Sequence, residues 1–255
     1  MENRGGSLAT GFAVVAWLLF AVGTTVAAAP AGVPHAPHRT IAVTVLADSV
    51  LRNNEIWMVD ILRAMTDVSL EITEISGIVL KIKAYDYWTP GFPGSEPGGS
   101  RSVRTVADYL ASMNRYIRNS GRGDCEIVIG LVPEGPDGPV FPGIADYLMG
   151  TVVLKHLKSK GGIPYVLLHE VCHIFGAVDL RTSGSVMSLR DPSFRVDEFT
   201  KAIIRANRLR SFRDGVFPLP GDIVPEAVHL YEERQALGLG EEELSICLGV
   251  LKAVR

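Results

Sequence analysis

The sequence predicts an α/β protein of the α+β kind, and three observations support this fold class. Short β-branched apolar runs alternate with stretches whose apolar residues recur every three or four positions, in the order strand, helix, strand, helix, strand, strand. One apolar run, residues 127–132, is almost continuous, which is typical of a strand buried on both faces. The last third of the chain, in contrast, has a helical and irregular pattern.

The first predicted strand covers residues 41–46, after a linker at residues 29–39. A helix follows, because five apolar residues lie on one helical face and Gly77 can end it. These five are Ile61, Met65, Val68, Ile72 and Ile75. Residues 78–87 are the second strand, and the Pro/Gly-dense stretch 89–100 must be a surface loop.

Apolar spacing predicts a second amphipathic helix over residues 106–117, before the buried strand at 127–132. A second turn-rich loop, residues 133–143, leads into segment 144–154. We expect this segment to be one strand near the sheet edge, interrupted by Gly150.

Two further helices are expected at residues 164–175 and 196–212, followed by a helical C-terminal tail. Asp197 suits the start of the second of these helices. His156 and His229 lie outside any metal-ligand spacing, so we expect them at the surface.

Composition excludes some classes of protein. The chain has 255 residues, of which 47% are hydrophobic, enough for one substantial domain. Its 25 basic and 28 acidic residues give a formal net charge of −3, so no binding surface for nucleic acid is indicated. Cys125, Cys172 and Cys247 are too few to suggest a disulfide framework, and we expect buried thiols.

The first 28 residues are typical of a secretory signal. Arg4 precedes an uncharged stretch with its apolar centre at residues 12–22, and small residues allow a cut after Ala28. The uncharged run is also long enough to span a bilayer, so an uncleaved anchor, with residues 12–29 as the membrane tether, is the alternative. In both cases the domain that follows would be exported, either secreted or anchored outside the membrane.

The most informative stretch holds His169, Glu170 and His173. Four residues of α-helix advance about 400° and about 6 Å, so both imidazoles leave nearly the same face and can share one tetrahedral zinc ion. Glu170 lies about 100° round the helix from His169. It can therefore border the ion without binding it, and accept a proton as a general base.

Gly176 and Asp179 complete the predicted site. Glycine enters the left-handed conformation without a Cβ clash, so the helix can end at Gly176 and the chain can reverse. The reversal brings Asp179 back toward the metal. Two imidazoles and one carboxylate leave a fourth position for water, as in catalytic zinc sites. Cys172 points about 100° away from His173, so we expect a buried thiol there rather than a fourth ligand.

Residues 169–179 resemble the extended zinc-binding motif of the metzincin metallopeptidases, in the form with aspartate as third ligand found in snapalysin-like members. Residues 185–188, Ser-Val-Met-Ser, resemble the Met-turn of that family, in which a methionine, here Met187, forms an apolar floor under the zinc. The interval of eight residues from the third ligand to this methionine also resembles the archaemetzincins, although Leu180 and Ser185 stand where that group has cysteines.

The resemblance implies a zincin-like fold for residues 40–255. A mixed twisted sheet and the active-site helix would form an N-terminal subdomain (40–176), and a small, mostly helical C-terminal subdomain (177–255) would carry the third ligand. It further implies that residues 143–154 are an antiparallel edge strand that lines the cleft and binds an extended peptide through main-chain hydrogen bonds. The residues expected to make these contacts are Gly143, Ile144, Ala145, Asp146 and Tyr147.

By the same resemblance, the chain is expected to be a monomeric zinc metalloendopeptidase that cleaves protein or peptide substrates. Two other functions stay open. A catalytically silent adaptor domain could keep zinc for stability and bind peptides, although it would not need Glu170. A membrane-anchored structural factor would depend instead on the N-terminal segment.

Overall fold

The fold is taken from a computed structural model, which describes residues 39–54, 56–91, 105–121, 125–133, 142–156, 162–180, 184–188, 193–212, 228–229 and 232. The predicted signal or anchor (1–28), nearly all of the linker (29–39), most of both predicted loops and the end of the C-terminal tail lie outside these residues. Within the described parts of the chain, no helix is both long enough and apolar enough to cross a membrane.

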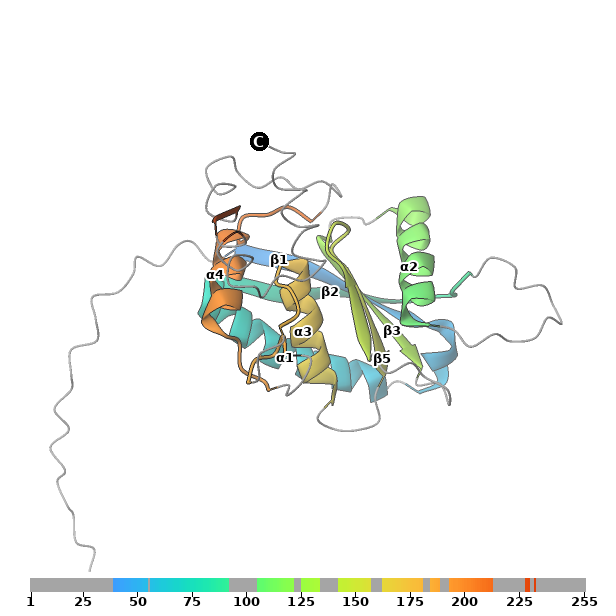
Figure 1. The fold of residues 1–255 in the computed structure, drawn as a ribbon. Coiled ribbons are helices and arrows are strands. Elements are labelled where there is room, and N and C mark those ends of the chain that lie inside the picture. Colours follow the sequence, from blue (N-terminus) through green and yellow to red (C-terminus); the bar gives the residue numbers. More distant parts are fainter. Residues whose placement is uncertain are drawn as a thin grey trace, which may run out of the picture. The chain divides into compact units, whose positions relative to one another are not determined.

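A five-stranded sheet organises the described residues, with strand order β2-β1-β3-β5-β4 (Figure 1). The strands are β1 (Arg39–Asp48), β2 (Ile78–Trp88), β3 (Ile127–Pro133), β4 (Gly143–Asp146) and β5 (Thr151–His156). β1 pairs in parallel with β2 and β3, and β3 pairs in parallel with β5. β4 runs antiparallel to β5 at the edge. The predicted α/β class, in its α+β form, is confirmed.

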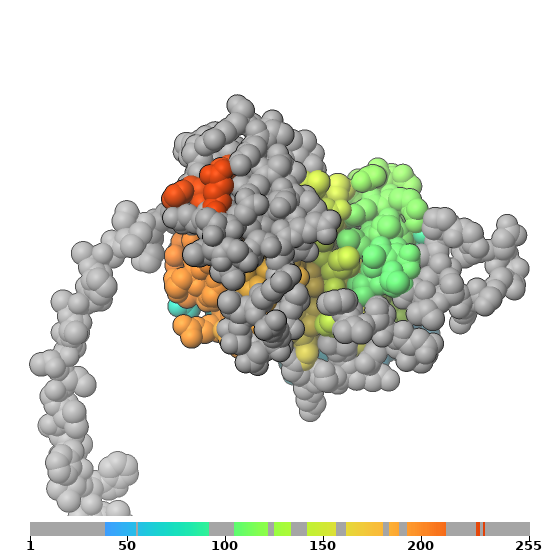
Figure 2. Space-filling view, viewed as in Figure 1, coloured from blue at the N-terminus to red at the C-terminus, as the bar shows by residue number. Residues whose placement is uncertain are grey.

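Helices cover both faces of the sheet. Alternate residues of β3 enter two separate apolar cores: Ile129 lies with α1 (Ile56–Ser76) and α3 (Gly162–Ile174), while Val128 lies with α2 (Val106–Ser120). β3 is therefore buried on both faces, as its continuous apolar sequence predicts. Figure 2 shows α2 beside the segment that forms β4 and β5. The remaining helix of the described residues, α4 (Glu198–Ala206), packs against α1, and a short 3-10 turn, η1 (Ser49–Asn53), follows β1.

The prediction of one strand over residues 144–154 is wrong, because this segment is a hairpin of β4 and β5. The Asp146 carboxylate accepts hydrogen bonds from the backbone N–H groups of Leu148 and Met149, which closes a turn directly after β4. Gly150 then has φ 56°, a left-handed conformation that glycine adopts without strain. The predicted antiparallel edge strand is thus β4 alone, and β5 lies inside the sheet.

Two further predictions need correction. The helix expected at 196–212 is shorter, since α4 ends at Ala206, although Asp197 caps its start as expected by accepting from the Thr200 backbone N–H. His156 is not a simple surface residue: its side chain is 12% exposed, and its Nε2 lies 3.1 Å from the Asp60 carboxylate. His229 is exposed, as expected.

Candidate metal centre

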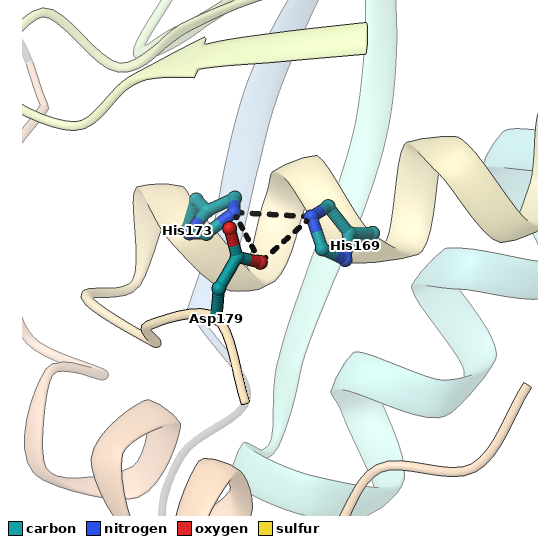
Figure 3. Close-up of side chains that lie close together, drawn as sticks. All are labelled: His169, His173 and Asp179. Carbon is teal, nitrogen blue, oxygen red and sulfur yellow. Dashed lines mark hydrogen bonds and ion pairs between the residues drawn. The ribbon is translucent and has the colours of Figure 1, made fainter. Parts of the chain in front are cut away.

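Helix α3 presents two histidines side by side, and most of its other residues are buried. Leu167, Leu168 and Cys172 have no exposed surface and pack in the core, so the helix is held against the sheet. His169 and His173 lie one turn apart on the partly exposed face, and their Nε2 atoms are 3.1 Å apart (Figure 3). The helical period thus places both imidazoles as the spacing predicts.

The chain reverses after α3 through a specific hydrogen-bond pattern. The Gly176 N–H donates to the His173 carbonyl at 2.8 Å, and the Ala177 N–H donates to the Cys172 carbonyl at 3.0 Å. These two bonds are those of a Schellman motif, in which the residue in the Gly176 position is left-handed, and Gly176 has φ 90°. The motif turns the chain back along the helix, so Asp179 faces the two imidazoles (Figure 3).

Three atoms that could bind a metal ion lie close together. Asp179 Oδ1 is 3.3 Å from His169 Nε2 and 3.5 Å from His173 Nε2, and the two nitrogens are 3.1 Å apart. In a tetrahedral zinc site with bonds of about 2.0–2.1 Å, neighbouring donor atoms are about 3.3 Å apart. The three atoms therefore have the spacing of three corners of such a site, and this triad is a candidate metal site.

Hydrogen bonds to the other ring nitrogens indicate which atoms carry protons. His169 Nδ1 lies 2.8 Å from the Val186 carbonyl oxygen, and His173 Nδ1 lies 2.8 Å from the Ala177 carbonyl oxygen. A carbonyl only accepts, so we assign the proton of each neutral ring to Nδ1. Each Nε2 then offers a lone pair, and Asp179 Oδ1 is buried with no hydrogen-bond donor among the described residues. Three converging acceptors fit a cation.

The electrostatics of the triad agree with this assignment. Burial, followed by the nearby charge of His173, lowers the pKa of His169, which favours the neutral ring that binds metals. For Asp179, burial alone raises the pKa, but the adjacent His173 and His169 rings outweigh it and lower the pKa overall. The direction of these two shifts favours a neutral His169 ring and an ionised Asp179 carboxylate.

The segment that contains Met187 is tied to both the triad and α4. The Val186 carbonyl accepts from His169 Nδ1 and also from the Tyr165 hydroxyl, at 2.9 Å. Ser185 Oγ donates to Asp197, the cap of α4, and accepts from the Met187 N–H. The Met187 side chain has no exposed surface and belongs to the core that includes α3. Its role as a floor under a metal stays a prediction.

The predicted general base, Glu170, is 5% exposed and lies against the start of β4, where its side chain approaches Gly143. The structure thus places Glu170 between the ligand-bearing helix and the strand expected to bind substrate. Its role as a base stays a prediction.

The five residues expected to contact substrate occupy β4 and the turn after it. β4 pairs with β5 along one side, and no strand among the described residues pairs with its other side. Two of the five have side chains with polar or cation–π contacts to other parts of the chain. The Asp146 carboxylate accepts from Asn114 as well as from its own turn, and the Arg210 guanidinium lies 3.9 Å from the centre of the Tyr147 ring. Substrate contact through this strand stays a prediction.

Two residues near the site are not among the site residues predicted from the sequence. Tyr165 precedes His169 by four positions, so helical spacing alone would have placed it on the same face. Burial, with the negative charges of Asp179 and Glu170, raises the pKa of Tyr165 to about 12. Arg210 is fully buried and donates to the Ile174 carbonyl at the end of α3 and to the Tyr147 carbonyl after β4.

The expectation of buried thiols is confirmed for Cys125 and Cys172, which are both buried and unoxidised. Burial strongly raises the pKa of Cys172, and the thiol has no exposed surface. Cys247 lies outside the described residues.

Comparison with known proteins gives no family assignment: no family model and no curated protein matches the chain. Two of the solved structures that are similar to part of the chain are as follows. One, a chaperone–substrate complex, is 12% identical with a TM-score of 0.45, over 66% of this chain and 34% of that one, so most of that chain's length is unmatched. The other, a zinc-dependent peptidase from Methanocorpusculum labreanum (strain Z), is 13% identical with a TM-score of 0.42, over 64% of this chain and 99% of that one. At this identity and TM-score, neither likeness assigns a function to this chain.

Proposed function

We propose that the protein is a zinc-dependent metalloendopeptidase of metzincin type. The observation that carries the proposal is the convergence of His169 Nε2, His173 Nε2 and Asp179 Oδ1, with separations of 3.1–3.5 Å. Two imidazoles and one carboxylate suit zinc, and three protein ligands leave the open position that a hydrolytic zinc site needs. A bound zinc ion would polarise the substrate carbonyl and lower the pKa of water.

The chain's own residues supply the proton transfers and the alignment. Glu170 accepts a proton from water on its carboxylate and later donates that proton to the nitrogen of the departing amine. The Val186 and Ala177 carbonyls hold the two rings in the tautomer that keeps Nε2 available. A rigid pair of ligands on α3 requires little rearrangement when metal binds.

The substrate class follows from β4. An unpaired strand edge offers main-chain N–H and C=O groups to an extended peptide, which would add to the sheet as a further strand. Residues 143–147 would then hold the peptide next to Glu170, which itself lies against Gly143. This arrangement favours unstructured protein segments over folded ones, because only an extended backbone can pair in this way.

The wider setting is part of the same proposal. Residues 1–28 would direct export as a signal, or residues 12–29 would tether the chain, so that the peptidase domain (40–255) works outside the membrane. Within it, residues 177–255 would form the C-terminal subdomain. We expect a monomer that does not bind nucleic acid, since the net charge is only −3.

The test compares wild type with Glu170→Ala in protein lacking residues 1–28. Zinc is measured by mass spectrometry of the dialysed protein, and cleavage is measured on a library of unstructured peptides. We expect about one zinc per chain in both proteins, and cleavage only by wild type. Zinc in both proteins with cleavage by neither would instead favour the silent adaptor. Equal cleavage by both would remove Glu170 from the mechanism.

A further inference from the structure

Helix α3 passes very close to the first residue of β4. A Cβ atom at Gly143 would lie 2.8 Å from Glu170 Oε1, 2.9 Å from Glu170 Cγ and 2.7 Å from Val166 Cγ1. Side-chain carbons do not approach other heavy atoms this closely, so a Cβ here would force a movement. Two of the three contacts are with Glu170. The bare backbone at Gly143 therefore forms one wall of the space that the Glu170 side chain occupies.

Backbone conformation does not explain why glycine is present at this position. Gly143 is not among the described glycines with positive φ. Its φ therefore lies outside the left-handed region that favours glycine over alanine. Because Gly143 has no side chain, Glu170 and Val166 can lie close to its backbone.

The Glu170 carboxylate is the part of this contact best able to move. β4 is fixed by its pairing with β5, where Gly143 faces Leu154, and by the hydrogen bond from the Lys155 N–H to the Pro142 carbonyl. Val166 is buried on α3, one turn before Glu170. The end of a glutamate side chain turns about several single bonds, so a methyl group at position 143 would redirect the carboxylate before it shifted either backbone.

We propose that Gly143 is a positioning residue for Glu170. Its missing side chain lets α3 approach β4 closely enough for the strand to hold the carboxylate in its working direction. The proposal rests on the proposed function of Glu170 as the base. It gives Gly143 a role that does not depend on main-chain contact with substrate.

The kinetic arm of the test uses Gly143→Ala with a matched strand glycine as control. We expect Gly143→Ala to keep one zinc per chain and to lower kcat about 100-fold with KM nearly unchanged, because a misplacement of about 1 Å in a catalytic group costs that much. The control is Gly130→Ala on β3, where a Cβ would lie 2.6 Å from Met113 Sδ in the core beneath α2. We expect this control to lower the unfolding midpoint but to leave kcat of the folded enzyme unchanged.

The second arm measures the contact without using catalysis. Urea unfolding midpoints are compared for wild type, Gly143→Ala, Glu170→Ala and the double variant, with a parallel set in which Val166→Ala replaces Glu170→Ala. The proposal predicts that Gly143→Ala lowers the midpoint clearly when Glu170 is present and much less when Glu170 is alanine. The proposal is overturned if Gly143→Ala lowers the midpoint equally with glutamate and with alanine at position 170. It is also overturned if Val166→Ala, and not Glu170→Ala, reduces the effect of Gly143→Ala.

The two arms also separate this inference from the proposed function. If the midpoint shift of Gly143→Ala depends on Glu170 but wild type cleaves no peptide, the proposed peptidase function is refuted. The contact between Gly143 and Glu170 then has no catalytic role. Cleavage by wild type with an unchanged kcat in Gly143→Ala would refute the positioning role alone.

Discussion

Replacing Asp179 with asparagine tests the third ligand of the candidate site. The substitution keeps the size and one oxygen of the side chain but removes its charge. Asp179 Oδ1 lies within 3.5 Å of both imidazole Nε2 atoms and supplies the only negative charge of the triad. Changing a residue that only orients a ligand costs about 10–100-fold in metal affinity. Loss of a charged ligand should therefore lower the zinc affinity by at least the upper end of this range, about 100-fold.

This loss of affinity converts into a stability difference. If free zinc is held at about 100 times the wild-type dissociation constant, binding stabilises wild type by about 2.7 kcal/mol. A 100-fold weaker site is only half filled at the same zinc concentration and gains about 0.4 kcal/mol. For a chain of this size, 1 kcal/mol corresponds to about 2–4 °C in Tm. Zinc should therefore raise the Tm of wild type by about 5–11 °C and that of Asp179→Asn by about 1–2 °C.

The assay is thermal unfolding in a zinc buffer and in a chelator, read by circular dichroism. The control is Asp60→Asn, which removes the charge of another carboxylate that contacts a histidine, His156, at 3.1 Å. We expect the control to keep the full zinc-dependent shift. If Asp179→Asn also keeps it, the assignment of Asp179 as a ligand is refuted.

Three further predictions address pH, thiol chemistry and packing. The pKa of His169 is lowered in the folded protein from its usual 6.5, so at pH values between the folded-state and unfolded-state pKa the unfolded chain binds more protons. The metal-free protein should therefore lose stability as the pH falls below about 6.5. Urea unfolding at pH 7.5 and 5.5 checks this, and equal stability at both would contradict it. Cys172, with no exposed surface, should resist iodoacetamide until the protein unfolds, as peptide mass spectrometry can show; rapid labelling of the native protein would argue against a buried thiol. Arg210→Ala should lower the free energy of unfolding by about 3–5 kcal/mol, because it opens a cavity and leaves the Ile174 and Tyr147 carbonyls without this donor. A loss of less than about 1 kcal/mol, measured by urea unfolding, would contradict this prediction.

The triad could be predicted from the sequence because its geometry is local. His169, His173 and Asp179 lie within one helix and the turn that ends it. The helical period sets the first two, and the reversal at Gly176 sets the third. The same reasoning explains why the prediction of the buried face of α1 is correct, since apolar residues spaced three or four positions apart lie on one face of a helix.

Contacts between distant segments could not be predicted in this way. The close approach of Gly143 to Glu170 depends on how α3 crosses the sheet edge, which no local pattern encodes. Arg210 reaches Tyr147 across 63 positions, and a lone arginine in a helical stretch normally indicates a solvated surface. The hairpin over residues 144–154 was missed for a related reason. Both strands contain apolar residues that fit a single run, and the turn between them depends on one carboxylate and one glycine.

X-ray absorption at the zinc edge of the purified domain, isolated without added metal, identifies the ion and its ligand atoms. We expect zinc bound to two imidazole nitrogens and to oxygen atoms at about 2.0–2.1 Å, with four ligands in total and no sulfur. A sulfur ligand at about 2.3 Å, or protein that binds no zinc when it is offered, would contradict the assignment of His169, His173 and Asp179 as a catalytic metal site.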